Sequence, residues 1–364
     1  MRYANITGWG KYVPPMVMSN DDLARVVDTS DEWIRSRSGI ERRHYSHLTT
    51  GEMAWQAAEQ ALAAAGVAPE SIDMLILGST TGSDLCPNTA SFVLDKLGAG
   101  NAGCMDLNSA CTSWFYALVN ATAMVRSGQI ERALVIGAEH LSIVMNWHER
   151  STAVLFGDGA GAVVIEASDQ PSGLIQSAWS VVRDTRPTLE MNGLGINPTN
   201  LFKSPQRHLA FDGQAIFKNA VKGMADACTD VLDKAGLSVD DIDLFVPHQA
   251  NIRIIEALAK RLDFPVEKII VRIQEYANTS AASIPLALTD ALEAGQIKPG
   301  MTILVATFGG GLTCGAGIIQ WGDSVEPKES VPVSTAGFSG NIFDLMQDSF
   351  AYHDIDVSSL LSEG

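Results

Sequence analysis

The sequence predicts an α/β protein made of two similar halves. Helix-like and strand-like hydrophobic patterns alternate along most of the 364 residues, which is typical of α/β architecture. An internal repeat divides the chain, because Ala65-Gly66-Val67 recurs 170 residues later as Ala235-Gly236-Leu237, each time before an apolar strand. Gly128-Gln129-Ile130 likewise recurs 167 residues later as Gly295-Gln296-Ile297. Since this period is far too long for a solenoid, we expect two duplicated α/β halves related by a pseudo-twofold axis.

The expected elements follow one order in both halves. In the first half we predict helices over 51–65, 89–97 and 112–126, and strands over 74–77, 103–110, 133–137 and 162–165. In the second half we predict strands over 244–246 and 303–306 and a helix over 283–294. A glycine-rich turn precedes the last strand of each half, at 157–161 and 309–311. The first of these turns lacks the Lys-Ser/Thr of a phosphate loop and precedes no helix, which argues against a nucleotide cradle.

Composition and charge exclude several classes of protein. Five cysteines without a Cys-x-x-Cys pair argue against a disulfide framework or a metal site and favour a reducing cytoplasm. No apolar run is long enough to span a bilayer, and the first residues lack the layout of a signal peptide. The net charge of −17 argues against a surface that binds nucleic acid.

Cys111 is the first candidate for a reactive residue. It lies between a strand-like run and a helix-like run, where backbone N–H groups and the helix dipole favour negative charge. Such a position lowers the pKa of a thiol and makes it a nucleophile. The alternative is a buried core cysteine, which is what most free cysteines are.

The repeat points to two partners for this thiol. The offset of 167 maps Cys111 onto Asn278, which also precedes a helix-like run. His248 follows the strand 244–246 directly and is a third polar residue at the end of a strand. Because a pseudo-twofold axis brings equivalent corners together, we expect the three side chains to share one site. A thiol suits acyl transfer, and imidazole and amide N–H groups suit stabilisation of an enolate oxygen.

At this point the sequence resembles the 3-oxoacyl-[acyl-carrier-protein] synthase III family, the initiating condensing enzymes of type II fatty-acid synthesis. Matching stretches cover most of residues 1–322. They are Thr29 to Ile34, Ser38 to Arg43, Phe156 to Ala162, Val246 to Ile252, Asn278 to Ser283 and Phe308 to Leu312. The resemblance implies a thiolase-like fold with α-β-α-β-α layers. It also implies boundaries of 1–170 for the N-terminal half, 171–322 for the C-terminal half and 323–364 for an extension.

The resemblance implies a role for each candidate. Cys111 would carry the acyl primer from acyl-CoA, and His248 and Asn278 would stabilise the enolate formed from malonyl-acyl carrier protein. The Cys111 and Gly310 backbone N–H groups would form the oxyanion hole. The substrates would be these two thioesters, with no cofactor and no metal, and the protein would be a homodimer.

The family also suggests binding residues. Trp33 and Arg150 match the pair that stacks on the CoA adenine, and Arg37 matches a basic CoA contact. Lys218 and Arg253 match positions that dock the acidic carrier protein, and a local basic patch can steer such a partner even in an acidic enzyme.

Three features depart from the family pattern. Cys86 stands where acetyl-preferring relatives have an aromatic gate supplied by the dimer partner, which favours a primer longer than acetyl. Trp114 is bulky and would fill the freed space in the primer pocket. Ala277 replaces a usual glycine before Asn278, and would shift that side chain.

The residues from 323 onward have no counterpart in the usual family length. They contain eight acidic residues, one lysine, and the aromatics Phe338, Phe343, Phe350 and Tyr352. We expect this extension to pack on the body or on a partner, with disorder as the alternative.

Three other functions remain open from the sequence. A degradative thiolase would use Cys314 as a second reactive thiol. A polyketide or quinolone pathway enzyme would share the same triad. An acyl-binding scaffold would carry an inert Cys111.

Overall fold

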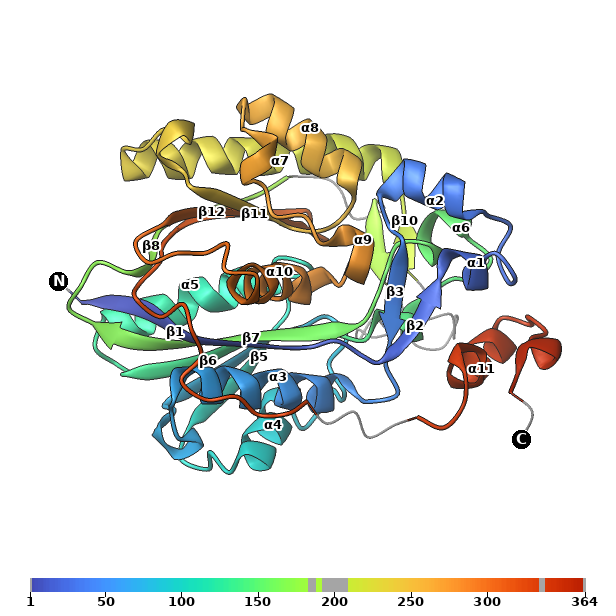
Figure 1. The fold of residues 1–364 in the computed structure, drawn as a ribbon, viewed down its shortest axis with the longest axis horizontal. Helices are drawn as coiled ribbons and strands as arrows, with labels where there is room; N and C mark the ends of the chain where they lie inside the picture. The colour runs from blue at the N-terminus through green and yellow to red at the C-terminus, as the bar shows by residue number, and fades with distance from the viewer. Residues whose placement is uncertain (1, 183–187, 192–208, 334–337, 363–364) are drawn as a thin grey trace.

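Five layers make up the fold in the computed structural model, which describes residues 2–182, 188–191, 209–333 and 338–362. From top to bottom in Figure 1, helices, sheet, helices, sheet and helices alternate. The central layer holds α5 (Ser113–Arg126) and α10 (Ser283–Glu293). The outer layers hold α7 (Gly213–Ala235) with α8 (Ile252–Leu262) on one side, and α3 (Thr50–Ala65) with α4 (Thr89–Leu97) on the other.

The strand order is the same in both halves. The nine strands are hydrogen-bonded in one order, in which the parallel pairing of Ala4 on β1 with Gly173 on β8 joins the halves. Outward from that pairing, the first half runs β1-β7-β6-β4-β5 and the second runs β8-β13-β12-β11. In both, the first two pairs are antiparallel and the third pair is parallel. The strands of the first half are β1 (Tyr3–Tyr12), β4 (Met74–Gly78), β5 (Gly103–Leu107), β6 (Arg132–Glu139) and β7 (Gly159–Ser168). Those of the second are β8 (Gly173–Val181), β11 (Leu244–Pro247), β12 (Thr302–Gly309) and β13 (Thr313–Gln320). This duplication confirms the fold class that the sequence predicts.

Two details differ between the halves. Helices α5 and α10 begin 170 residues apart, so Cys111 lies two residues before its helix and Asn278 lies five before the other. Among its described residues, the second half has no full counterpart of β5. A single parallel bridge between Phe245 and Ile269 lies at the equivalent edge.

Smaller elements cover the edge of the fold beside these halves. They are β2 (Met16–Ser19), α1 (Asn20–Leu23), α2 (Asp31–Ser38), β3 (Arg42–Tyr45), α6 (Arg150–Ala153), β9 (Leu189–Met191), β10 (Leu209–Phe211) and α9 (Ile273–Tyr276). Their apolar side chains form a core of their own, which includes Ile34, Tyr45 and Trp147. This core is separate from the one between the two sheets.

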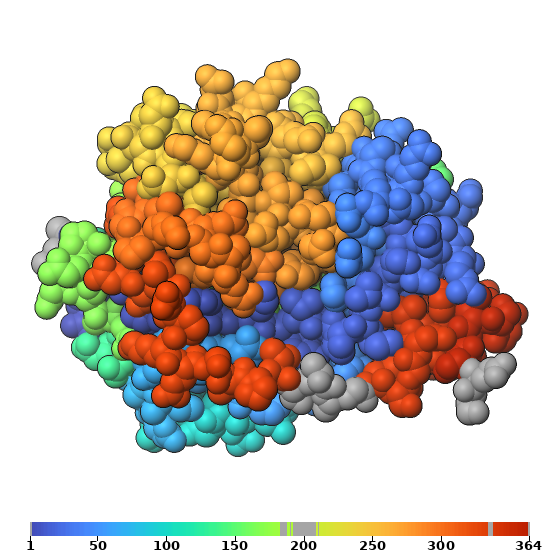
Figure 2. Space-filling view, in the orientation of Figure 1, coloured from blue at the N-terminus to red at the C-terminus, as the bar shows by residue number. Residues whose placement is uncertain are grey.

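The C-terminal extension packs on the body in its described part. The backbone N–H of Lys328 and its Nζ donate to the last carbonyls of α3, at Ala64 and Ala65. A cation there complements the negative end of the helix dipole. Helix α11 (Ile342–Tyr352) then lies against the N-terminal elements, at the right of Figure 2, with Phe343 buried. No helix in the described parts of the chain is long and apolar enough to cross a membrane.

Glycine allows β1 to approach α3 closely. A Cβ on Gly8 would lie 2.2 Å from the Ala61 carbonyl oxygen, whereas a Cβ on Gly100 would have no heavy atom within 4 Å. We therefore expect Gly8→Ala to lower the free energy of unfolding by about 1–3 kcal/mol. Gly100→Ala is the matched control and should leave the urea unfolding midpoint unchanged. Equal midpoints for the two variants would contradict this packing.

Candidate active site

A cavity of about 1170 Å³ lies where the two halves meet, and it contains the predicted triad. Cys111 comes from the first half, and His248 and Asn278 come from the second. Gly310 lines the same cavity. The structure thus brings together the residues that the sequence selected from separate corners.

Cys111 lies on a tight turn between β5 and α5. The preceding residue, Ala110, has a φ of 51°, which is an unfavourable backbone conformation for a residue with a Cβ. The Ser113 hydroxyl donates to the Ala110 carbonyl at 2.6 Å, and Thr307 Oγ1 donates to the Cys111 carbonyl at 3.2 Å. These bonds hold the turn in place. Its strained backbone conformation is typical of functional sites.

The thiol of Cys111 does not have the low pKa that its position in the sequence suggests. Burial raises the pKa of Cys111 to about 12, with the charge of Glu139 acting in the same direction and a hydrogen bond from Ser280 opposing it. The sequence-based expectation is wrong for the resting chain because desolvation penalises the thiolate.

His248 is neutral in this site. Burial lowers the pKa of His248 to about 4, and its Nδ1 lies 2.6 Å from the Ser283 hydroxyl. If that hydroxyl donates, Nε2 carries the proton and can donate to a ligand. Between pH 6.5 and 4 only the unfolded chain binds this proton, so folding stability falls as the pH decreases through this range.

The amide of Asn278 is oriented by its own loop. Its Oδ1 accepts a hydrogen bond from the Ser280 N–H at 2.9 Å, which leaves Nδ2 as the group that can donate elsewhere. The preceding Ala277 has φ 56° and ψ −158°, a conformation that glycine adopts far more readily. The alanine that replaces the usual glycine at position 277 therefore strains the backbone by about 1–3 kcal/mol.

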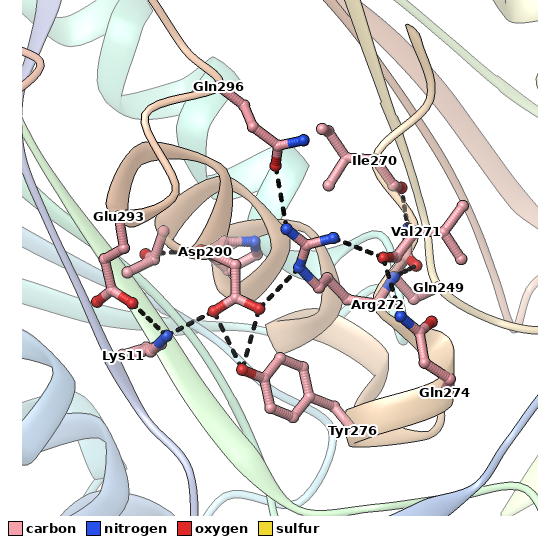
Figure 3. Close-up of polar contacts among 12 residues, drawn as sticks. Lys11, Gln249, Ile270, Val271, Arg272, Gln274, Tyr276, Asp290, Glu293 and Gln296 are labelled. Carbon is pink, nitrogen blue, oxygen red and sulfur yellow. Dashed lines mark hydrogen bonds and ion pairs between the residues drawn. The ribbon is translucent and has the colours of Figure 1, made fainter. Parts of the chain in front are cut away.

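A network of charged and polar groups fixes the segment that leads to Asn278 (Figure 3). Asp290 on α10 lies at its centre and accepts hydrogen bonds from Lys11, from Arg272 Nε at 2.9 Å and from the Tyr276 hydroxyl at 3.0 Å. Gln249 joins this network next to His248, since its Oε1 accepts from the Arg272 N–H at 2.7 Å. These bonds connect the segments that carry His248 and Asn278 to the same hydrogen-bond network.

Glu139 is a site residue that the sequence reasoning missed. It ends β6 with no exposed surface, and its carboxylate accepts from the Ser280 hydroxyl at 2.9 Å. Thr81 donates to it through both N–H and Oγ1, and Thr80 through N–H. Burial raises its pKa. The signal in the sequence was an acidic residue two positions after the predicted apolar strand 133–137.

The glycine turn after β12 lies directly against the nucleophile. A Cβ on Gly309 would lie 2.9 Å from the Cys111 nitrogen and 3.0 Å from the Thr112 nitrogen. A Cβ on Gly310 would lie 3.4 Å from the Ala110 Cβ. This turn of the second half thus lies directly against the main chain of Cys111 and Thr112 in the first half.

Two of the predicted CoA residues line the cavity, and the third, Arg150, contacts one of them without lining it. The Arg150 guanidinium lies 4.4 Å from the centre of the Trp33 ring, which is a stacked cation–π contact. Trp33 and Arg37 line the cavity. Arg150 also donates to the Asp28 carbonyl at 3.0 Å, which fixes the guanidinium in place.

The predicted docking residues lie outside or at the rim of the cavity. Arg253 is exposed and lines the cavity, whereas Lys218 is exposed on α7 and does not line it. Phe217, next to Lys218, is 37% exposed and also lines the cavity.

One of the two predictions for the primer pocket needs correction. Trp114 is 1% exposed in the core between the two sheets, because its position on α5 faces that layer, and it does not line the cavity. Cys86 is exposed on a loop and does not line the cavity of its own chain, so its place at the cavity of a dimer partner stays a prediction. The apolar walls come instead from residues that the sequence did not single out: Leu141, Phe156, Leu189, Met191 and Leu209.

Cys314 does not provide a second thiol at the site. It lies on β13 with no exposed surface, and a Cβ on Gly223 of α7 would lie 2.4 Å from its sulfur. Burial raises its pKa to about 11. Within the described residues, no group of three or more His, Cys, Asp or Glu side chains could hold a metal ion.

A thiol, a neutral imidazole and an amide at the junction of a duplicated α/β fold define a condensing acyltransferase with a thiolase-like fold. The comparisons agree with this class. Residues 105–181 match the family model described as 3-oxoacyl-[acyl-carrier-protein (ACP)] synthase III, and residues 232–321 match the model for its C-terminal part. The chain belongs to the 3-oxoacyl-[acyl-carrier-protein] synthase III family, and it is an acyltransferase.

Relatives and solved structures cover most of the chain. It is 47% identical over 327 residues to beta-ketoacyl-[acyl-carrier-protein] synthase III 2 of Vibrio cholerae, covering 89% of this chain and 90% of that one. The crystal structure of the Aquifex aeolicus synthase III has a TM-score of 0.83 at 41% identity, covering 87% of this chain and 100% of that one. The priming β-ketosynthase of the R1128 polyketide pathway has a TM-score of 0.84 at 33% identity, covering 89% and 97%.

The raised thiol pKa gives a testable pH dependence. Only the thiolate reacts with iodoacetamide, so labelling of Cys111 should rise about tenfold per pH unit between pH 7 and 9, without a plateau. Glu139→Gln removes a negative charge and should speed labelling at fixed pH. Glu70→Gln, an exposed control, should not. Site-resolved mass spectrometry measures the rates, and a plateau near neutral pH would contradict the burial effect.

Proposed function

We propose that this enzyme joins an acyl-CoA primer to malonyl-acyl carrier protein and so initiates type II fatty-acid synthesis. The observation that carries the proposal is the meeting of the Cys111 thiol with neutral His248 and the oriented Asn278 amide in one cavity. The family of the chain fits this reaction.

Cys111 would take the acyl group in the first step. Its sulfur attacks the thioester carbonyl, the carbon–sulfur bond to CoA breaks, and CoA leaves with the proton of the thiol. The N–H groups of Cys111 and Gly310 would stabilise the negative oxygen of the tetrahedral intermediate.

His248 and Asn278 would act in the second step. Malonyl-acyl carrier protein loses CO2, and the electron pair left behind forms an enolate. The enolate oxygen accepts hydrogen bonds from the N–H groups of His248 and Asn278. The enolate carbon attacks the acyl carbonyl on Cys111 and releases 3-oxoacyl-acyl carrier protein. The departing thiolate recovers a proton from solvent. A neutral imidazole suits this role because it needs no proton from solution.

The binding residues support the two substrates. Trp33 and Arg150 would hold the CoA adenine by stacking, and Arg37 would pair with its phosphates. Exposed Lys218 and Arg253 would meet the acidic carrier protein. No group in this scheme requires a cofactor or a metal.

We infer that the primer is longer than acetyl. The cavity has apolar walls from Leu141, Phe156 and Met191, and Trp114 does not occupy it. Apolar side chains of this kind favour burial of an acyl chain.

A homodimer would complete the assembly. Strand β5 is an edge of the sheet, and Met105 on it is 38% exposed. The nearby loop carries Cys86 and Leu85, which is 83% exposed. Pairing with a second copy would cover this edge and place Cys86 near the partner's cavity. Five free cysteines favour a cytoplasmic location.

A priming enzyme of a polyketide pathway is the second candidate. The R1128 priming ketosynthase supports it through its similar fold and 33% identity. The two candidates differ in which carrier protein accepts the product, so comparison of carrier proteins from both pathways separates them.

Intact-mass detection of acyl-Cys111 tests the reaction. A panel of acyl-CoAs should acylate the protein once, with slower reaction for acetyl than for longer chains, and Cys111→Ala should abolish the adduct. Asn278→Ala should keep acylation but lose condensation by about 10²–10³-fold, since it removes an enolate donor. An acetyl optimum would contradict the inference of a longer primer. If no adduct forms, the protein would be an acyl-binding scaffold and not an acyltransferase with a reactive Cys111.

Charge reversal tests the docking surface. We expect Arg253→Glu to raise the KM for malonyl-acyl carrier protein about tenfold while acylation by acyl-CoA changes little. Lys298→Glu, an exposed lysine on another side of the fold, is the control. The effect should shrink in high salt, because exposed charges are screened. Equal KM values for both variants would exclude Arg253 from docking.

A further inference from the structure

Helix α11 of the C-terminal extension contacts the segment that carries Arg150. The Trp147 ring lies 4.8 Å from the Phe350 ring, centre to centre, and Trp147 Nε1 donates to the Ser349 hydroxyl at 2.8 Å. Phe350 has no exposed surface and Trp147 is 2% exposed. The indole is thus enclosed by the extension and has its polar atom satisfied there.

A short turn connects Trp147 to Arg150. The His148 N–H donates to Asn146 Oδ1 at 3.2 Å, and the Glu149 N–H donates to the Asn146 carbonyl at 3.1 Å. Since these bonds make the turn compact, a shift of the indole moves the start of α6, where Arg150 lies.

The same helix also contacts the chain segment that carries Asp28. The Arg25 guanidinium lies 5.1 Å from the centre of the Phe343 ring. Arg25 precedes Asp28, whose carbonyl accepts the hydrogen bond from Arg150. Helix α11 therefore touches both chain segments that fix the Arg150 guanidinium, through two neighbouring aromatic rings whose centres lie 6.3 Å apart.

We propose that α11 positions Arg150 over Trp33 and thereby sets the affinity of the nucleotide end of acyl-CoA. Phe350 and Phe343 are positioning residues in this scheme and touch no substrate. The inference rests on the proposed CoA role of Trp33 and Arg150. It assigns a role to a segment outside the family models, which end at residue 321.

Preorganisation is the physical reason for the effect. At 4.4 Å the guanidinium and the indole leave no room for a base between them, so the adenine would stack on the outer face of the guanidinium. An arginine loses rotamer freedom when it stacks, and a guanidinium already held over the indole avoids that cost. Without the ring of Phe350, the Trp147 side chain keeps its edge contact with Tyr45 but loses its nearer aromatic partner, and the turn that carries Arg150 is less restrained.

The test compares thioesters with and without a nucleotide. In the full-length chain, Phe350→Ala should raise the KM for an acyl-CoA about five- to tenfold, while kcat and the KM for malonyl-acyl carrier protein stay within twofold. The KM for the same acyl group on N-acetylcysteamine, which lacks the nucleotide, should not change. Phe350→Leu should recover part of the affinity, and Gln347→Ala, exposed on the same helix, should have no effect.

Two further variants separate the possible failures. Trp33→Ala should raise the KM for acyl-CoA, and adding Phe350→Ala should raise it little more, because both changes remove one interaction. If Trp33→Ala has no effect, the CoA site itself is wrong. If Trp33→Ala acts but Phe350→Ala does not, or if Phe350→Ala weakens both thioesters equally, the positioning role is wrong. Ser349→Ala, which removes one hydrogen bond, gives a milder readout if Phe350→Ala does not fold.

Discussion

The buried carboxylate of Glu139 joins the two halves of the fold where the reactive groups meet. It ends a strand of the first half and accepts the hydroxyl of Ser280, which belongs to the second half. Ser280 in turn orients Asn278 through its N–H and contacts the Cys111 thiol. A buried charge is stable only when its oxygens are fully bonded, so this one carboxylate constrains the relative position of all these groups.

Backbone strain gathers at the same point. Ala110, Ala277 and Ser280 all have a positive φ, and each lies within three residues of a reactive group or in contact with one. Such conformations persist when the surroundings over-determine them. Here the network around Asp290 and the bonds to the Cys111 turn supply that restraint. As a consequence, the geometry of the site depends on residues that lie far from the reactive side chains.

The repeat in the sequence predicted the two duplicated halves and the meeting of Cys111 with Asn278, which share one cavity. The layered thiolase-like fold came from the family resemblance, and His248 from its position directly after a strand. The repeat could be recognised because glycine turns and apolar strands form a local sequence pattern, and duplication makes this pattern occur twice. It did not reveal the thiol pKa, because burial is a property of the assembled halves. Trp114 was misplaced since a bulky residue after a nucleophile can face either the cavity or the core, and only the helix rotation decides. Glu139 was missed because its donors are distant in sequence.

The close approach of Gly309 to the Cys111 nitrogen limits how this protein can change. A side chain at position 309 would occupy the space of the main chain that carries the nucleophile, so no substitution can narrow or reshape that wall without moving the thiol. A covalent inhibitor whose polar atom rests against Gly309 would therefore meet a wall that a substitution at this position cannot alter without displacing the nucleophile. Contacts to the apolar walls offer no such protection, because those side chains can vary in size.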